Sequence, residues 1–160
     1  MLTKKLIFIT FLSFAVFFSF GQNKQPSKKE LLVTKVEYSI QSGKYEISVN
    51  RVHPMRSSVL HLTSEYNVRI SGDSAYVNLP YFGRVYVASF NEDGGIKLAT
   101  SIDNYKVENK KGKNYSIDFS AKGSNDVFRF SITVWTNGTA SINVTCNNRQ
   151  GIRYSGEMKL

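Results

Sequence analysis

The sequence predicts an all-β fold, an antiparallel up-and-down barrel with a short helix before its first strand. Beyond Gly43, apolar residues recur with a period of two instead of about 3.6. About nine or ten strand-like runs follow one another through tight turns, with no helical pattern between them. Neighbouring runs also match as hairpins in sequential order. Sequential hairpins favour a closed barrel, and a β-sandwich is the alternative.

Residues 1–21 have the form of a signal peptide. Lys4 and Lys5 precede an apolar run over residues 6–18, and Ser19-Phe20-Gly21 ends in the small-residue pattern of a cleavage site. The apolar segment is shorter than the ~20 residues that cross a bilayer as a helix. We therefore expect cleavage between Gly21 and Gln22, export to the periplasm or the medium, and no transmembrane segment after cleavage.

The cysteine count limits how the exported chain is held. Cys146 is the only cysteine in the sequence. A single cysteine allows no intramolecular disulfide, so the hydrophobic core must stabilise the fold. A lipoprotein needs a cysteine at the cleavage site, so we do not expect a lipid anchor at this chain's own N-terminus.

The mature chain is basic without a concentrated polyanion site. Removal of Lys4 and Lys5 leaves 19 basic and 12 acidic residues, a net charge of +7. The positive residues are spread over nearly every segment, and the one dense cluster, Lys110 to Lys113, has the composition of a β-turn. Nucleic acid is therefore not expected as a partner.

The first elements are a polar leader and a short helix. Residues 22–27 are polar and are expected to be disordered. Ser27 followed by Glu30 matches a capping box, and the apolar residues up to Ile40 lie near helical spacing. Leu31 to Val33 would also suit the start of a strand. Residues 28–160 are expected to form a single β-barrel domain.

The hairpins can be tested by asking whether each turn also brings apolar residues opposite one another. Gly72-Asp73, as a two-residue loop, pairs Ile70 with Ala75 and Val68 with Val77. Three later loops predict a four-stranded meander. The expected pairs are Val107–Tyr115 and Tyr105–Ile117 around residues 110–112, Phe119–Phe128 and Ile117–Phe130 around residues 122–125, and Val134–Ala140, Ile132–Ile142, Phe130–Val144 and Phe128–Cys146 around residues 136–138.

One face of this meander is apolar and the other polar. The apolar face carries large side chains, which favour a filled barrel interior and confine any ligand to one mouth. Cys146 falls on this face, so we expect a buried and unreactive thiol. The large side chains are Tyr105, Tyr115, Phe119, Phe128 and Phe130.

The segment from Leu79 to Val87 contains the candidate binding residues. Pro80 interrupts strand pairing, and two aromatic residues and a glycine follow it. One interpretation is an aromatic and cationic lip for a ligand or a protein partner. The other is a bulged corner whose aromatic rings close the end of the core. The residues of the lip are Tyr81, Phe82, Arg84 and Tyr86.

Three segments carry a resemblance to a known family. They are Leu79-Pro80-Tyr81-Phe82-Gly83-Arg84, Glu92-Asp93-Gly94-Gly95, and the run from Asn148 to Gly156. With them, residues 28–160 resemble the bacterial domain-of-unknown-function family 4251. The resemblance implies an exported or envelope protein of Gram-negative bacteria with a lipocalin-like barrel, and it brings no activity or catalytic residues.

Catalytic patterns are sparse. His61 and Glu65 would share one face of a helix, but in strand-like sequence they lie about 13 Å apart, so no metal site, cofactor or catalytic residue is predicted. We expect a non-catalytic exported module that binds a small apolar or amphipathic ligand at a barrel mouth. A cell-envelope protein–protein interaction module is the alternative, and an enzyme is the least favoured class.

Overall fold

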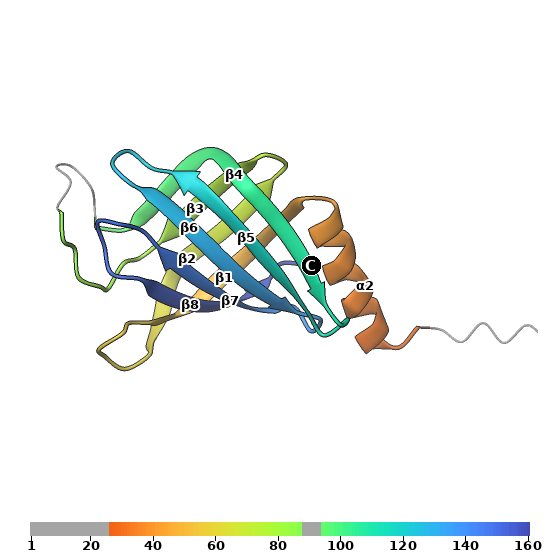
Figure 1. The fold of residues 1–160 in the computed structure, drawn as a ribbon. Helices are drawn as coiled ribbons and strands as arrows, with labels where there is room; N and C mark the ends of the chain where they lie inside the picture. Colours follow the sequence, from red (N-terminus) through yellow and green to blue (C-terminus); the bar gives the residue numbers. More distant parts are fainter. Residues whose placement is uncertain (1–25, 88–93) are drawn as a thin grey trace, which may run out of the picture.

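The computed structural model describes residues 26–87 and 94–160. The predicted signal peptide and its cleavage site at Gly21 and Gln22 lie outside these residues, as do most of the leader and residues 88–93. Helix α2 is followed by eight antiparallel strands that pair in sequential order and close into a barrel (Figure 1). The elements are α2 (Lys28–Gln41), β1 (Lys44–His53), β2 (Leu60–Ser71), β3 (Ser74–Leu79), β4 (Ile96–Lys110), β5 (Asn114–Lys122), β6 (Val127–Trp135), β7 (Thr139–Thr145) and β8 (Ile152–Met158).

This arrangement confirms the predicted lipocalin-like up-and-down barrel with an N-terminal helix and excludes the sandwich. The expectation of nine or ten strands was too high for the described residues. Strand β4 is 15 residues long and continues through an irregularity between Asp103 and Lys106. The segment after Leu79 forms an isolated bridge, Val85 to Arg149, in place of a strand.

Helix α2 begins at the predicted capping box. The Ser27 hydroxyl accepts the N–H of Glu30 at 3.2 Å, and the Glu30 carboxylate accepts the N–H of Ser27 at 2.7 Å. Val36 and Ile40 are buried in the barrel core, and α2 lies at one end of the barrel (Figure 1). Within residues 26–87 and 94–160, the structure contains no helix with the length and apolar character of a bilayer span.

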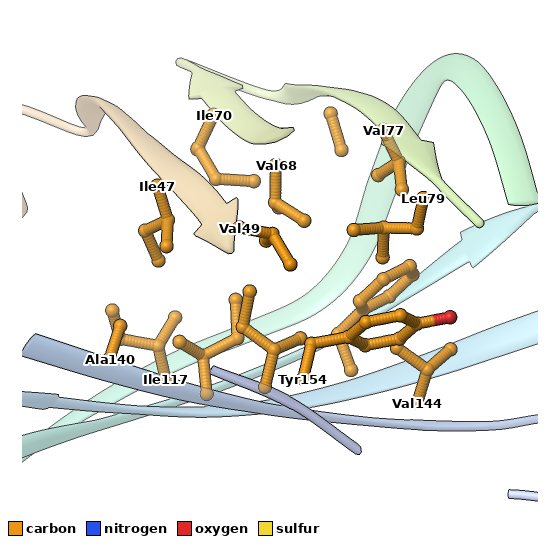
Figure 2. Packing of buried hydrophobic residues seen from close by; sticks show 14 of the residues in the cluster. Ile47, Val49, Val68, Ile70, Val77, Leu79, Ile117, Ala140, Val144 and Tyr154 are labelled. Atoms are coloured by element: carbon orange, nitrogen blue, oxygen red, sulfur yellow. The ribbon is translucent and has the colours of Figure 1, made fainter. Parts of the chain in front are cut away.

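Apolar side chains from opposite walls meet inside the barrel. In Figure 2 the side chains of β1, β2 and β3 face those of β5, β7 and β8. Phe119 and Phe130 stack with ring centroids 4.8 Å apart, and Tyr154 is fully buried. Of the large residues predicted to face inward, Tyr115, Phe119, Phe128 and Phe130 are buried and Tyr105 is partly buried, as the period of two indicated.

Two of the four predicted hairpin registers are confirmed and two are wrong. The hairpin around Gly72-Asp73 pairs as expected, and around residues 136–138 so do Val134–Ala140, Ile132–Ile142 and Phe130–Val144. The ladder between β6 and β7 ends at Arg129–Thr145, so it does not include the expected pair Phe128–Cys146. Around the other two loops three expected pairings are displaced by two residues, and Tyr105, expected opposite Ile117, lies in the irregularity between Asp103 and Lys106. Val107 faces Ile117 instead of Tyr115, Phe119 faces Phe130 instead of Phe128, and Ile117 faces Ile132 instead of Phe130. A two-residue displacement leaves each side chain on the same face, so alternation alone does not detect it.

The barrel closes where β8 pairs with β1. The register shifts between Val49 and Arg51, directly beside Gly156. A Cβ atom at Gly156 would overlap the Ser48 carbonyl oxygen and lie 2.9 Å from its carbon. Glycine at this position therefore permits the close approach of the two strands that seals the barrel.

Candidate functional site

The end of the barrel away from α2 is built from loops (Figure 1). We call this surface the loop end and define it as residues 54–59, 80–87, 94–95, 123–126 and 146–151. It contains all four residues predicted to form the binding lip, Tyr81, Phe82, Arg84 and Tyr86. Its geometry is set by hydrogen bonds between segments that are far apart in the sequence.

Residues 80–87, the crossing segment, pair with the connection between β7 and β8. The Tyr86 N–H donates to the Asn148 carbonyl at 2.8 Å, and the Gln150 N–H donates to the Arg84 carbonyl at 2.9 Å. The bridge between Val85 and Arg149 lies between these two bonds. The crossing segment is thus a short stretch of ladder that holds two connections together.

Two tyrosine hydroxyls fix the crossing segment to the barrel. The Tyr81 hydroxyl lies 2.7 Å from the Gln150 carbonyl oxygen and 2.8 Å from that of Arg84. The Tyr154 hydroxyl, on β8, donates to the Pro80 carbonyl at 2.7 Å. Burial raises the pKa of the Tyr81 phenol, so the hydroxyl stays neutral and acts as a donor.

A buried arginine connects the crossing segment to the start of β4. Arg149 is 8% exposed, and its guanidinium carbon lies 5.4 Å from the centroid of the Tyr81 ring. Its Nη1 donates to the Gly95 carbonyl at 3.1 Å and to the Gly94 carbonyl at 3.4 Å. Because a buried charge needs polar partners, these contacts make Arg149 a fixed structural element.

A carboxylate organises the remaining loops. Asp126 accepts the backbone N–H groups of Val127 at 2.8 Å, Asn147 at 3.2 Å and Asn148 at 2.7 Å. Burial acts to raise the pKa of Asp126, but these N–H donors outweigh it and hold the pKa below its ordinary value of 3.8. The ionised carboxylate therefore stabilises this corner and is occupied by backbone donors.

These contacts join the segments on which the family resemblance depends. A family model, Domain of unknown function (DUF4251), matches residues 27–158 of the chain. The chain belongs to the DUF4251 family. A crystal structure of a DUF4251 family protein from Bacteroides eggerthii DSM 20697 is similar, with a TM-score of 0.64 and 17% identity over 80% of this chain and 87% of that chain. That likeness shows the fold. Among curated proteins, none matches the chain.

In this DUF4251 member the three segments that carry the family resemblance come together at the loop end. Tyr81 contacts Gln150, and Arg149 contacts Gly94 and Gly95. Glu92 and Asp93 lie outside the described residues. These contacts make the described parts of the three segments one hydrogen-bonded corner.

The structure separates the four predicted lip residues into two groups. Tyr81 turns inward and is hydrogen-bonded, as the interpretation of a closed corner requires. Phe82 and Tyr86 are 48% and 64% exposed, and Arg84 is also exposed. Aromatic and cationic side chains are therefore available at the surface, while Tyr81 supports them from beneath.

Sequence reasoning missed two contributors to this end. Arg149 belongs to one of the three motifs, but the residues next to it in the sequence gave no indication that its side chain would be buried. Met55, in the connection between β1 and β2, is 72% exposed and its sulfur accepts the Gln150 side-chain N–H at 3.2 Å. The contact between Met55 and Gln150 joins residues that are 95 positions apart in the sequence.

The described residues show little machinery for covalent chemistry. Cys146 is partly buried beside the core, and burial, together with the negative charge of Asp126, raises the pKa of its thiol. In residues 26–87 and 94–160, no three His, Cys, Asp or Glu side chains are placed to hold a metal ion. The exposed aromatic rings and arginines of the loop end are suited to non-covalent binding.

Proposed function

We propose that this DUF4251 member is a non-catalytic exported binding module that takes a small apolar or amphipathic ligand at its loop end. The observation that carries the proposal is the exposure of Phe82 and Tyr86 on a fixed backbone. The hydrogen bonds of Tyr81 and the packing of Arg149 fix the backbone of the crossing segment, so the positions that carry the two exposed rings are ordered before a ligand arrives. Preorganised aromatic side chains at the surface are typical of binding sites.

Export is part of the proposal and depends on residues 1–21. Lys4, Lys5 and the apolar run after them support cleavage before Gln22. N-terminal sequencing of the protein from the periplasm and from the medium of its own host tests this. A chain that retains Met1 in the cytoplasm would contradict it.

A protein partner in the cell envelope is the second candidate. The observation in its favour is the breadth of the exposed surface, since Met55 extends the apolar area beyond the crossing segment onto another connection. A surface formed by separate loops suits a partner wider than a small molecule.

Native mass spectrometry of the protein purified from its own host distinguishes these candidates. Co-purified small molecules favour the ligand and a bound chain favours the partner. Bare monomer under every condition weakens both proposals. The result identifies the class of occupant without assuming its identity.

A matched pair of double variants tests whether the loop end is the site. The probe is anilinonaphthalene sulfonate, an anionic amphiphile whose fluorescence rises in apolar surroundings. We expect Phe82→Ser with Tyr86→Ser to weaken probe binding by at least about tenfold, since two half-exposed rings lose their apolar contact. The control, Leu31→Ser with Tyr38→Ser, removes side chains that are 48% and 72% exposed at the α2 end. Equal loss in both double variants would exclude the loop end as the site.

A further inference from the structure

Exposed apolar side chains gather on the loop end. They come from the connection between β1 and β2 and from the crossing segment, which Gln150 links by contacts to Met55 and to Arg84. They are exposed to solvent, in contrast to the buried side chains of the core. These side chains and their exposed fractions are Met55 72%, Val59 47%, Phe82 48%, Val85 46%, Tyr86 64% and Val87 58%.

Exposed basic side chains accompany this apolar area. Arg56 and Arg84 lie within the loop end, and Arg51, Lys122 and Arg153 lie on strand ends next to it, all exposed. Burial and the charges of Arg153 and Arg51 lower the pKa of His53, which is consistent with a positive local field.

The described part of the same surface has little negative charge. Among the described residues of the loop end, Asp126 has the one carboxylate, and its oxygens accept three backbone N–H bonds. At the α2 end, by contrast, acidic side chains accompany the basic ones, as in the pair of Glu46 with Lys159 at 2.6 Å. The described part of the loop end therefore combines exposed apolar side chains with charge that is mostly positive.

We propose that the loop end docks on a membrane leaflet rich in anionic phospholipid, an inference that rests on the proposed function and names the source of its amphipathic ligand. Phe82, Tyr86 and Met55 enter the boundary between headgroups and acyl chains, while Arg56 and Arg84 contact lipid phosphates. Peripheral binding of this kind needs both apolar area and charge attraction.

Two features favour a bilayer over a soluble amphiphile or an acidic protein. The apolar side chains project from separate loops at one end of the molecule, which suits a broad planar surface. Arg56 follows Met55 in the chain, and Arg84 lies between Phe82 and Tyr86, so apolar and charged groups can enter adjacent layers of a leaflet together. Charge complementarity with anionic headgroups thus accompanies insertion of the aromatic rings.

Vesicle co-sedimentation tests the proposal with the protein produced with its own export segment and purified from its host. One set of vesicles contains equal parts of phosphatidylglycerol and phosphatidylcholine, and the other contains phosphatidylcholine alone. We expect binding to the first set, weakened by added salt, and little binding to the second. Equal binding to both sets, or to neither, overturns the proposal.

Matched variants assign the binding to this end. Arg56→Gln with Arg84→Gln is expected to weaken binding to the anionic vesicles about 30-fold, because each lost cation near the surface weakens it about fivefold. Lys35→Gln with Lys110→Gln removes the same charge at the α2 end and is expected to leave binding within about twofold, apart from the small effect of net charge. Thermal melts of each variant confirm that the barrel is folded. Equal weakening by the two pairs overturns the proposal.

The outcomes separate this inference from the proposed function. If the protein binds anilinonaphthalene sulfonate at the loop end and does not bind anionic vesicles, membrane docking is overturned and a ligand site at the loop end remains. Failure of both probes contradicts both proposals. Capture of an acidic envelope protein without vesicle binding also overturns membrane docking and favours the protein partner.

Discussion

Replacing Tyr81 by Phe tests whether its hydroxyl fixes the crossing segment. The substitution keeps the ring beneath the Arg149 guanidinium and removes one hydroxyl. That hydroxyl has one proton for two carbonyl oxygens, 2.7 Å away on Gln150 and 2.8 Å away on Arg84. The Arg84 carbonyl retains the Gln150 N–H at 2.9 Å, so the main loss falls on the Gln150 carbonyl.

The expected loss is about 1–2 kcal/mol. A hydrogen bond contributes about 1 kcal/mol net, and a carbonyl left with poorer solvation adds to the loss. Because the crossing segment pairs with the barrel through few bonds, this energy should appear mainly as easier local opening. Opening that is easier by 1–2 kcal/mol corresponds to amide exchange that is about 5- to 30-fold faster.

Native-state hydrogen exchange provides the assay. The reporting amides are those of Tyr86 and Gln150, which donate across the crossing segment, and the reference amides are those of the β5–β6 hairpin. We expect faster exchange at the two reporters and little change in the hairpin. Unchanged exchange at Tyr86 and Gln150 would refute the role of the hydroxyl, and equal acceleration everywhere would show global destabilisation instead.

Three further predictions concern closure, acid stability and the thiol. Gly156→Ala should destabilise the barrel by more than about 3 kcal/mol, because its Cβ would overlap the Ser48 carbonyl oxygen. The control in denaturant unfolding is Gly151→Ala, whose Cβ would lie 3.3 Å from the Thr145 methyl group and 3.6 Å from the Val144 carbonyl oxygen, and equal losses would contradict the close approach. The depressed pKa of Asp126 contributes stability above about pH 4, and this stability is lost as the pH falls through the folded-state pKa. Asp126→Asn should therefore reduce the acid-induced fall in Tm. An unchanged fall in Tm would contradict this role of Asp126. The raised pKa of Cys146 should make alkylation at about pH 8 slower than in the unfolded chain, and equal rates would show an accessible thiolate.

The sequence could predict the faces of the barrel better than its registers. A two-residue loop at Asn137-Gly138 would place Val134 opposite Ser141 and Ile132 opposite Asn143. These mismatches of apolar with polar side chains favour the three-residue loop, which is the observed one. Around Gly112, the loop moved by one residue because Lys111 takes a positive φ of 56° beside the 68° of Gly112. Lysine rarely adopts this conformation, so local composition gave no reason to expect it.

At the candidate site, too, local features could be predicted from the sequence and long-range contacts could not. The sequence could predict an aromatic and cationic corner, because Pro80 and Gly83 mark a break in strand pairing. It could not assign Tyr81 to the interior, since the acceptor on Gln150 is 69 residues away. The burial of Arg149 likewise depends on carbonyl groups supplied by another connection. Such contacts exist only once the barrel has closed.

The adjacent positions Tyr81 and Phe82 carry opposite roles. Tyr81 uses its polar tip inside the structure, whereas Phe82 has no polar atom to satisfy and is 48% exposed. A residue that stabilises the crossing segment and one that meets a ligand should therefore be separable by substitution. Tyr81→Phe should change local exchange with little direct effect on contact with a probe, while Phe82→Ser should weaken the probe and leave the Tyr86 and Gln150 amides protected. A reversal of these two effects would mean that Tyr81, and not the surface it supports, forms the binding site.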